Sequence, residues 1–454
     1  MNRAELTAAY LDDVKRRGTP AHELVAAQSK SEGFQAFYGG RYLSRPLFLG
    51  SDEVDQVYQD VETMRRALVS LPNRLYGGDV AAFARAVGMG EIQISAIQRS
   101  RGGTVQSRAD MYADDSGFKV LEYNMGSALG GIDQSDMARA MLAHPVLGEF
   151  AANHGLTYVD TMREQLNNMF DEGGIPRDAK PVLVTTDSPS SYKTLESFIV
   201  HFDARLREMG VEAYGTHIGH LEVRDGGVWF GDHKIDIIQR LFMLDDLTSD
   251  PELAKIMEPI LDAAARGEVS IFTPMDAEIY ASKAAMAMLS DEANRPLFSA
   301  QELASFDRVL PWTRMVRPGP VTLEDGRKVD LLEYALANRN DLALKPTLLF
   351  GGTGVLLGWR EDVTDQTWEE QVRAALDGPY VIQRRIRPVP ELFPADEGEP
   401  EPWLVTWGMF TMGCGFGGMY CRGASVESHM EVINVKAGAY SGTCLHPPAG
   451  DRLA

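Results

Sequence analysis

Four polar residues in two short segments have the side chains of a metal site. They are Arg108 and Asp110, followed twelve residues later by Glu122 and Asn124. Both segments are strand-like, and a turn-like loop at 115–117 separates them. A hairpin closed by this three-residue loop, with its glycine in the left-handed position, pairs Asp110 with Glu122. It also pairs Arg108 with Asn124 on the same face, because side chains alternate along a strand.

Two carboxylates directly across a ladder lie roughly 5 Å apart at Cβ and repel each other. A hard divalent cation removes that repulsion. The carboxylates of Asp110 and Glu122, with the amide oxygen of Asn124, are a ligand set for Mg²⁺ that leaves room for phosphate oxygens and water. Arg108 would then bind a phosphate or a carboxylate. The alternative is a solvated strand face on which the symmetry is accidental.

A glycine-rich segment follows a predicted strand that ends in Lys345-Pro346. Its glycines let backbone N–H groups approach phosphate closely. The segment is not a P-loop, because no Gly-Lys-Ser/Thr closes it, and a strand rather than a helix follows it. It therefore resembles a flap over a triphosphate, with Lys345 reaching the α- and β-phosphates. An ordinary hairpin is the alternative. The flap residues are Gly351, Gly352, Thr353 and Gly354.

Three further segments supply side chains suited to a nucleotide. The strand-like run at 379–392 could offer backbone groups near Gln383 to an adenine edge, with Glu391 near a ribose, or it could be an edge strand with solvated arginines. Lys283 begins an apolar helix, where its charge opposes the helix dipole, which is a small indication of a ligand. Arg422, on a glycine-rich strand, is a candidate for stabilising negative charge on a transferring phosphoryl group.

The elements that must position these residues form an α+β or α/β chain, multi-lobed, with mixed and antiparallel sheets flanked by helices. Apolar spacing predicts a helix at 52–70, and a strand–helix–strand pattern spans 181–240. The predicted parts are a helical region at 1–100, the metal-binding hairpin and helices of the catalytic core at 101–175, an α/β substrate-side lobe at 176–275, and an ATP-binding lobe with the remainder of the core at 276–454.

The net charge of the chain excludes some classes of partner. Lys plus Arg number 44 and Asp plus Glu number 65, so the formal charge of the 454 residues is −21. Such a surface repels nucleic acid and anionic membranes, and the sequence has no apolar run long enough to span a bilayer. Three cysteines and an N-terminus unlike a signal peptide indicate a cytoplasmic location. The spacing of the cysteines does not fit a zinc cluster.

Taken together, these motifs resemble the glutathionylspermidine synthase-like, circularly permuted ATP-grasp ligases. The resemblance covers residues 100–440 and rests on pieces in the order that such proteins use. The metal carboxylates precede the nucleotide lysines, as the permutation implies. The pieces are RAD at 108–110, EYN at 122–124, YASKAAMAML at 280–289, LPWTR at 310–314, LALKP with FGGTG at 342–354, YVIQR at 380–384, and GMYCRG with VIN at 418–434.

The resemblance implies an ATP site with two Mg²⁺ ions. Lys283 and Lys345 would contact the ATP phosphates, and Gln383 would lie near the adenine hinge. The glycine-rich loop would close over the nucleotide, and Arg108 would bind the phosphoryl or acyl-phosphate group. The implied metal ligands are Asp110, Glu122 and Asn124.

The implied activity is that of an ADP-forming carboxylate–amine ligase. A small-molecule or peptide carboxylate would attack the γ-phosphate of ATP, and an amine would then displace phosphate from the acyl-phosphate. No amidase domain is visible and the peptide-binding residues have no match, so glutathione and spermidine are not implied. A phosphotransferase on the same fold and a non-catalytic nucleotide-binding homologue are the alternatives. A homodimer is left open, and the acidic exterior favours a cationic amine.

Overall fold

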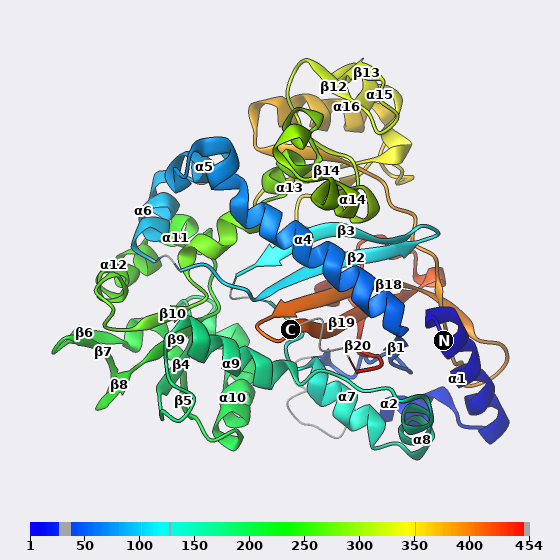
Figure 1. The fold of residues 1–454 in the computed structure, drawn as a ribbon, viewed down its shortest axis with the longest axis horizontal. Helices are drawn as coiled ribbons and strands as arrows, with labels where there is room; N and C mark the ends of the chain where they lie inside the picture. The colour runs from blue at the N-terminus through cyan, green and yellow to red at the C-terminus, as the bar shows by residue number, and fades with distance from the viewer. Residues whose placement is uncertain (27–37, 101, 127–128, 350, 449–454) are drawn as a thin grey trace.

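The computed structural model describes residues 1–26, 38–100, 102–126, 129–349 and 351–448 (Figure 1). They form a mixed α/β fold with five β-sheets flanked by helices. The largest sheet is antiparallel apart from one parallel pair at its edge, and it joins strands from both ends of the chain. Its order is β1 (Leu47–Phe48), β20 (Tyr440–Leu445), β19 (Gly415–Ser425), β18 (Glu401–Met412), β2 (Ser107–Asp114) and β3 (Gly117–Met125), with β17 (Glu391–Phe393) beside β18.

The hairpin of β2 and β3 has the predicted register at the polar residues. Asp110 pairs with Glu122 and Arg108 with Asn124, which confirms the predicted pairing. The predicted three-residue loop is wrong, because Asp114 pairs with Gly117 and the loop contains two residues. A register shift just beyond Asp110 leaves Leu121 without a partner in the ladder, so it forms a β-bulge that offsets the shorter loop.

The two faces of this sheet differ in chemistry. Helix α4 (Ser51–Tyr76), predicted at 52–70, packs across one face, where its apolar side meets Ala109, Met111 and Tyr123 (Figure 1). The intervening residues Arg108 and Asp110 point to the opposite face, because side chains alternate along a strand. They are buried, which contradicts the solvated-face alternative.

A second lobe contains a four-stranded parallel sheet. Its strands are β10 (Ser270–Phe272), β9 (Ile237–Arg240), β4 (Val182–Asp187) and β5 (Glu212–His217), in that order. Helix α10 (Tyr192–Glu208) connects β4 to β5 and packs on the sheet, which confirms the predicted strand–helix–strand unit. A hairpin of β6 (Glu222–Arg224) and β7 (Gly227–Phe230) follows.

A third lobe lies on the far side of the β2–β3 hairpin from the parallel sheet (Figure 1). Its sheet has the order β11 (Thr313–Met315), β16 (Tyr380–Arg384), β14 (Leu342–Pro346) and β15 (Leu356–Leu357). Helices α15 (Leu331–Ala337) and α16 (Asp365–Ala374) share an apolar core with it. Both neighbours of β16 are antiparallel to it.

The remaining helices and strands pack around these sheets. No helix among the described residues is long and apolar enough to cross a membrane. The other helices are α1 (Arg3–Arg17), α2 (Ala21–Ala26), α5 (Val80–Ala86), α6 (Glu91–Arg99), α7 (Gln134–Leu142), α8 (Pro145–His154), α9 (Thr161–Glu172), α11 (Asp246–Ser249), α12 (Pro251–Ala265), α13 (Lys283–Ser290) and α14 (Ala300–Val309). The other strands are β8 (His233–Ile235), β12 (Pro320–Thr322) and β13 (Lys328–Asp330).

A buried ion pair joins the parallel sheet to the segment before α13. Arg240 Nη1 lies 2.6 Å from Glu278 Oε1, and both side chains are almost fully buried. We expect Arg240→Met to lower the free energy of unfolding by about 3–5 kcal/mol, because it leaves Glu278 buried without its cation. Denaturant titration measures this. The double variant with Glu278→Met should be less destabilised than the single variant; an equal or larger loss would contradict the pairing.

Candidate functional site

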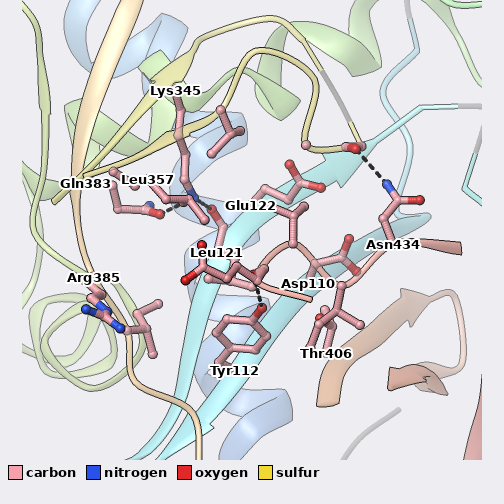
Figure 2. Close-up of a pocket in the computed structure, with 18 of the residues that line it drawn as sticks. Asp110, Tyr112, Leu121, Glu122, Lys345, Leu357, Gln383, Arg385, Thr406 and Asn434 are labelled. Atoms are coloured by element: carbon pink, nitrogen blue, oxygen red, sulfur yellow. Dashed lines mark hydrogen bonds between the residues drawn. The ribbon is translucent and has the colours of Figure 1, made fainter. Parts of the chain in front are cut away.

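A pocket lies between the polar face of the central sheet and the lobe of β14 and β16 (Figure 2). The space between its walls is about 780 Å³ and is partly open to solvent. Most of the residues singled out from the sequence line it, although they come from seven separate elements or loops. These residues are Asp110, Glu122, Lys283, Lys345, Gly351, Gly352, Gln383 and Arg422.

Asp110 is held between two arginines at the centre of the polar face. Arg108 donates from Nε to Oδ1 at 2.8 Å and from Nη2 to Oδ2 at 3.0 Å. Burial alone would raise the pKa of Asp110, but the charges of Arg108 and Arg422 outweigh it and lower the pKa to about 2. Arg108 contacts Asp110 but is not itself part of the described lining of the pocket. Asn124, also behind that lining, donates from Nδ2 to Asp110 Oδ2 at 3.3 Å.

Arg422 reaches Asp110 from the neighbouring part of the sheet, on β19. Its Nη2 lies 2.7 Å from Asp110 Oδ1, close enough for an ion pair, but outside hydrogen-bond geometry. The Nε and Nη2 donors are buried without a hydrogen-bond partner among the described residues. Since a buried donor without an acceptor is costly, Nε is suited to an anion, whereas Nη2 already faces the Asp110 carboxylate. Gly408 makes room here, because a Cβ would lie 3.0 Å from Asp110 Oδ1.

Glu122 is paired with the lysine that begins helix α13. Lys283 Nζ lies 3.3 Å from Glu122 Oε2 and also donates to the carbonyl of Leu349 at 2.8 Å. Lys283 is only 3% exposed, so this lysine is not a solvated surface residue. Its backbone N–H donates to the carbonyl of Thr347, which ties the start of the helix to the end of β14.

Lys345 is held by two neutral oxygens. Its Nζ donates to Gln383 Oε1 at 2.5 Å and to the carbonyl of Leu121 at 3.2 Å, as Figure 2 shows. The β-bulge therefore gives this carbonyl a partner outside the ladder. Gln383 in turn donates from Nε2 to Thr313 Oγ1 at 3.2 Å. Burial, followed by the nearby charge of Lys283, lowers the pKa of Lys345 to about 8.

The glycine-rich loop meets a second loop across the pocket. Gly351 and Gly352 have positive φ values of 64° and 80°. Asn434 donates from Nδ2 to the Gly351 carbonyl at 2.7 Å (Figure 2), and a Cβ on Gly352 would lie 2.6 Å from Val432. Thr353 and Gly354 are in the same loop but outside the described lining of the pocket. Residue 350 lies outside the described part of the chain.

An apolar slot lies at the β16 end of the pocket. Leu357, Trp359 and Ile386 line it, and the Arg385 guanidinium stacks 4.3 Å from the centre of a Trp359 ring. The alternative that β16 is an edge strand with solvated arginines is wrong, because β11 and β14 pair with it on both sides. The Arg385 N–H donates to the Asp341 carbonyl at 2.8 Å, so a backbone N–H that could face a base comes no earlier than Ile386.

Glu391 lies elsewhere in the structure. It is absent from the described lining of the pocket, which corrects the prediction that it approaches a ribose. Its carboxylate is 3.0 Å from Nη2 of Arg45 and 3.5 Å from Nε of Arg3. Because Arg45 is fully buried, it needs this carboxylate as its counter-ion. Besides Asp110 and Glu122, the acidic side chain of Glu431 lines the pocket, from the loop that also contains Asn434.

Comparison with solved structures identifies the fold. The chain is similar to a glutathione synthetase-like effector from Globodera pallida that was solved in its apo form. The match covers 89% of this chain and 89% of the effector, with a TM-score of 0.54 and 13% sequence identity. The chain has a glutathione synthetase-like fold. A second match is a candidate gamma-glutamylcysteine synthetase from Methylobacillus flagellatus KT. It covers 84% of this chain and 86% of the synthetase, with a TM-score of 0.43 and 14% sequence identity. No protein-family model and no curated protein matches the sequence.

Several pocket residues of this glutathione synthetase-like fold were missed from the sequence. Tyr112 and Thr406 line the polar face, and Tyr112 follows the Arg-x-Asp pattern by two residues, which is the spacing that keeps it on the same face. Asn434 stands in the VIN segment that contributed to the family resemblance. Trp359 and Glu431 stand in loops, where no periodic pattern marks them.

Proposed function

We propose that the protein is a Mg²⁺- and ATP-dependent carboxylate–amine ligase of the circularly permuted ATP-grasp type. One observation supports this most strongly. Two carboxylates from one hairpin, Asp110 and Glu122, share a pocket with three cations from separate segments, Lys283, Lys345 and Arg422. Phosphoryl transfer requires mainly such positioned cations, with a metal ion to neutralise the developing charge.

The residues present fit a metal-bound triphosphate. Asp110 and Glu122 face each other across the ladder, and the Nε donor of the nearby Arg422 has no hydrogen-bond partner within the described part of the chain. Asp110, Glu122 and the amide oxygen of Asn124 would hold Mg²⁺, with two ions as the resemblance implies. When bound, Mg²⁺ would neutralise charge on the β- and γ-phosphates. Among the described residues, no group of three or more His, Cys, Asp or Glu side chains is placed to hold a metal ion, so the amide oxygen of Asn124 would have to complete the set.

The protein side chains would then have separate tasks. Lys283 and Lys345 would bind the phosphates, and the apolar slot beside Trp359 would hold the base. A carboxylate oxygen of the acid substrate attacks the γ-phosphorus, and the bond to the ADP oxygen breaks. The amine nitrogen then attacks the acyl carbon, phosphate leaves with the bonding electrons, and the amine loses a proton. Arg422 and Arg108 would stabilise the negative charge during these steps.

The test of this function is product analysis. The purified chain is incubated with Mg²⁺-ATP, a panel of small-molecule and peptide acids, and a panel of amines that includes polyamines. A ligase releases ADP and phosphate only when both an acid and an amine are present, and mass spectrometry detects the amide. A stable phosphorylated product would instead indicate a phosphotransferase, and binding without turnover a non-catalytic homologue. The cytoplasmic location and the division into four parts remain predictions.

Lys345 gives the proposed nucleotide site a pH dependence. The ammonium form binds phosphate, and the lowered pKa means that this form is lost as the pH rises through about 8. An ordinary lysine stays charged to about pH 10. We therefore expect the affinity for an ATP analogue to fall between pH 7 and pH 9, measured by calorimetry. In Lys345→Met the affinity should be lower and flat over this range. A flat profile for the unmodified protein would contradict the assignment.

A further inference from the structure

Tyr420 lies on the polar face of the central sheet, next to the two arginines that hold Asp110. It precedes Arg422 by two residues on β19, so both side chains point to the same face. The centre of its ring lies 5.5 Å from the guanidinium carbon of Arg422 and 5.9 Å from that of Arg108. Both distances are within the range of cation–π attraction, so one ring contacts both cations.

A glycine makes the space between Asp110 and Tyr420. Gly408 stands between them in one row across three strands, since it pairs with Asp110 on β2 and with Tyr420 on β19. A Cβ on Gly408 would lie 3.0 Å from Arg108 Cδ and 3.0 Å from Asp110 Oδ1. The Arg108 side chain therefore lies against Gly408, and the ring of Tyr420 is the next side chain in that row.

Two contacts hold the ring of Tyr420 in place. Its hydroxyl lies 2.9 Å from Ser441 Oγ on the neighbouring strand β20, and both side chains are buried. The backbone of Gly131 approaches the ring so closely that a Cβ on this glycine would lie 2.1 Å from Tyr420 Cγ. The adjacent Gly130 carbonyl accepts a hydrogen bond from Arg108 Nη1. The ring is therefore confined beside the guanidiniums.

The two guanidiniums need such a support, because like charges repel each other. Each lies within ion-pair distance of the same carboxylate, that of Asp110. The negative face of an aromatic ring attracts both cations and offsets part of their repulsion. Tyr420 is outside the described lining of the pocket, so any role that it has in the reaction is exerted through the arginines. We propose that Tyr420 is a positioning residue for phosphoryl transfer, which holds Arg108 and Arg422 in the places that the proposed function, on which this inference rests, requires.

The first test compares Tyr420→Leu with the matched control Phe410→Leu in the full chain. Phe410 is a buried aromatic residue of the same apolar cluster, and its ring centre also lies 5.9 Å from the Arg108 guanidinium. Within the described part of the chain, however, it makes no cation–π contact with Arg422. The two variants therefore remove similar packing, but only Tyr420→Leu removes the ring that both arginines share.

We expect Tyr420→Leu to lower kcat for ADP release about 10- to 100-fold at nearly unchanged KM for ATP, since a displacement of about 1 Å has an effect of this order. Phe410→Leu should lower kcat much less. Tyr420→Phe keeps the ring and should retain most of the rate. Equal losses in the two leucine variants, or an effect on KM alone, would overturn the proposal.

The second test leaves every aromatic side chain in place. Gly131→Ala adds a methyl group that has to displace the ring of Tyr420, so we expect a similar loss of kcat. The positive φ of Gly131, 85°, adds backbone strain of its own to this variant. The double variant with Tyr420→Leu separates the two effects, because without the ring the methyl group should lower kcat little further. A full additional loss would assign the effect to backbone strain and overturn the proposal.

Crystal structures of the ligand-free variants test the positioning without any measurement of activity. In the unmodified protein, Arg422 Nη2 lies 2.7 Å from Asp110 Oδ1. We expect this distance to increase by about 1 Å or more in Tyr420→Leu and to stay unchanged in Phe410→Leu. Unmoved guanidiniums in Tyr420→Leu would overturn the proposal. If they move but the unmodified protein turns over no ATP with any acid and amine, the proposed function is wrong, whereas the positioning of the arginines by Tyr420 is upheld.

Discussion

Asp110→Asn and Glu122→Gln should each lower Mg²⁺-dependent ATP turnover about 100- to 1,000-fold, the range typical of a lost group that stabilises the transition state. Each substitution keeps the shape of the side chain and removes the charge that a hard cation requires. The two positions face each other across the β2–β3 ladder, so they belong to one site. Their effects should therefore be far from additive, with the double variant little worse than either single variant.

The measurement is the rate of ADP release at saturating ATP over a range of Mg²⁺ concentrations. Asp115→Asn is a matched control, because it removes an exposed carboxylate at the tip of the same hairpin. The control should keep the rate of the unmodified protein. Unchanged Mg²⁺-dependent turnover in both Asp110→Asn and Glu122→Gln would show that these carboxylates hold no metal.

Arg422→Met should lower kcat about 1,000-fold, the lower end of the effect of a positioned arginine in phosphoryl transfer. Its guanidinium is buried beside Asp110, and two of its donors lack a hydrogen-bond partner among the described residues. Arg422→Lys should not restore the rate, because an ammonium cannot place several donors in a fixed plane.

Steady-state kinetics distinguishes this role from simple ATP binding. A loss confined to kcat indicates that Arg422 acts on the transition state, whereas an increase in KM for ATP with unchanged kcat would contradict that role. Circular dichroism of Arg422→Met establishes that the protein is folded. Arg108 should still neutralise Asp110 in this variant, since it donates to both carboxylate oxygens.

The polar face of the hairpin could be predicted from the sequence because it depends on local rules. Alternation along strands and the spacing of two turn-flanked segments were sufficient to pair Asp110 with Glu122. The same reasoning could not reveal the bulge at Leu121, because a shorter loop and an extra residue in the strand have opposite effects on the register. The bulge matters, since it directs a carbonyl group to Lys345.

Residues whose partners lie far away in the sequence were harder to assign. Glu391 looked suited to a ribose, but it is the counter-ion of Arg45, which is 346 residues away. The strand that contains Gln383 has a paired strand on each side, and no local pattern specifies these neighbours. Because they occupy the backbone hydrogen-bonding groups of the strand, Gln383 reaches the pocket with its side chain and not with its backbone. The fold class was predictable from periodicity, whereas these roles depend on tertiary contacts.

The most direct test of the account is a crystal structure of the protein with Mn²⁺ and a non-hydrolysable ATP analogue. Mn²⁺ gives an anomalous signal that locates the ion independently of the model of the protein. We expect an anomalous peak between Asp110, Glu122 and the triphosphate, with the phosphates on Lys283, Lys345 and Arg422 and the base in the slot beside Trp359. A nucleotide bound outside this pocket, or an ion with no contact to Asp110 and Glu122, would contradict it.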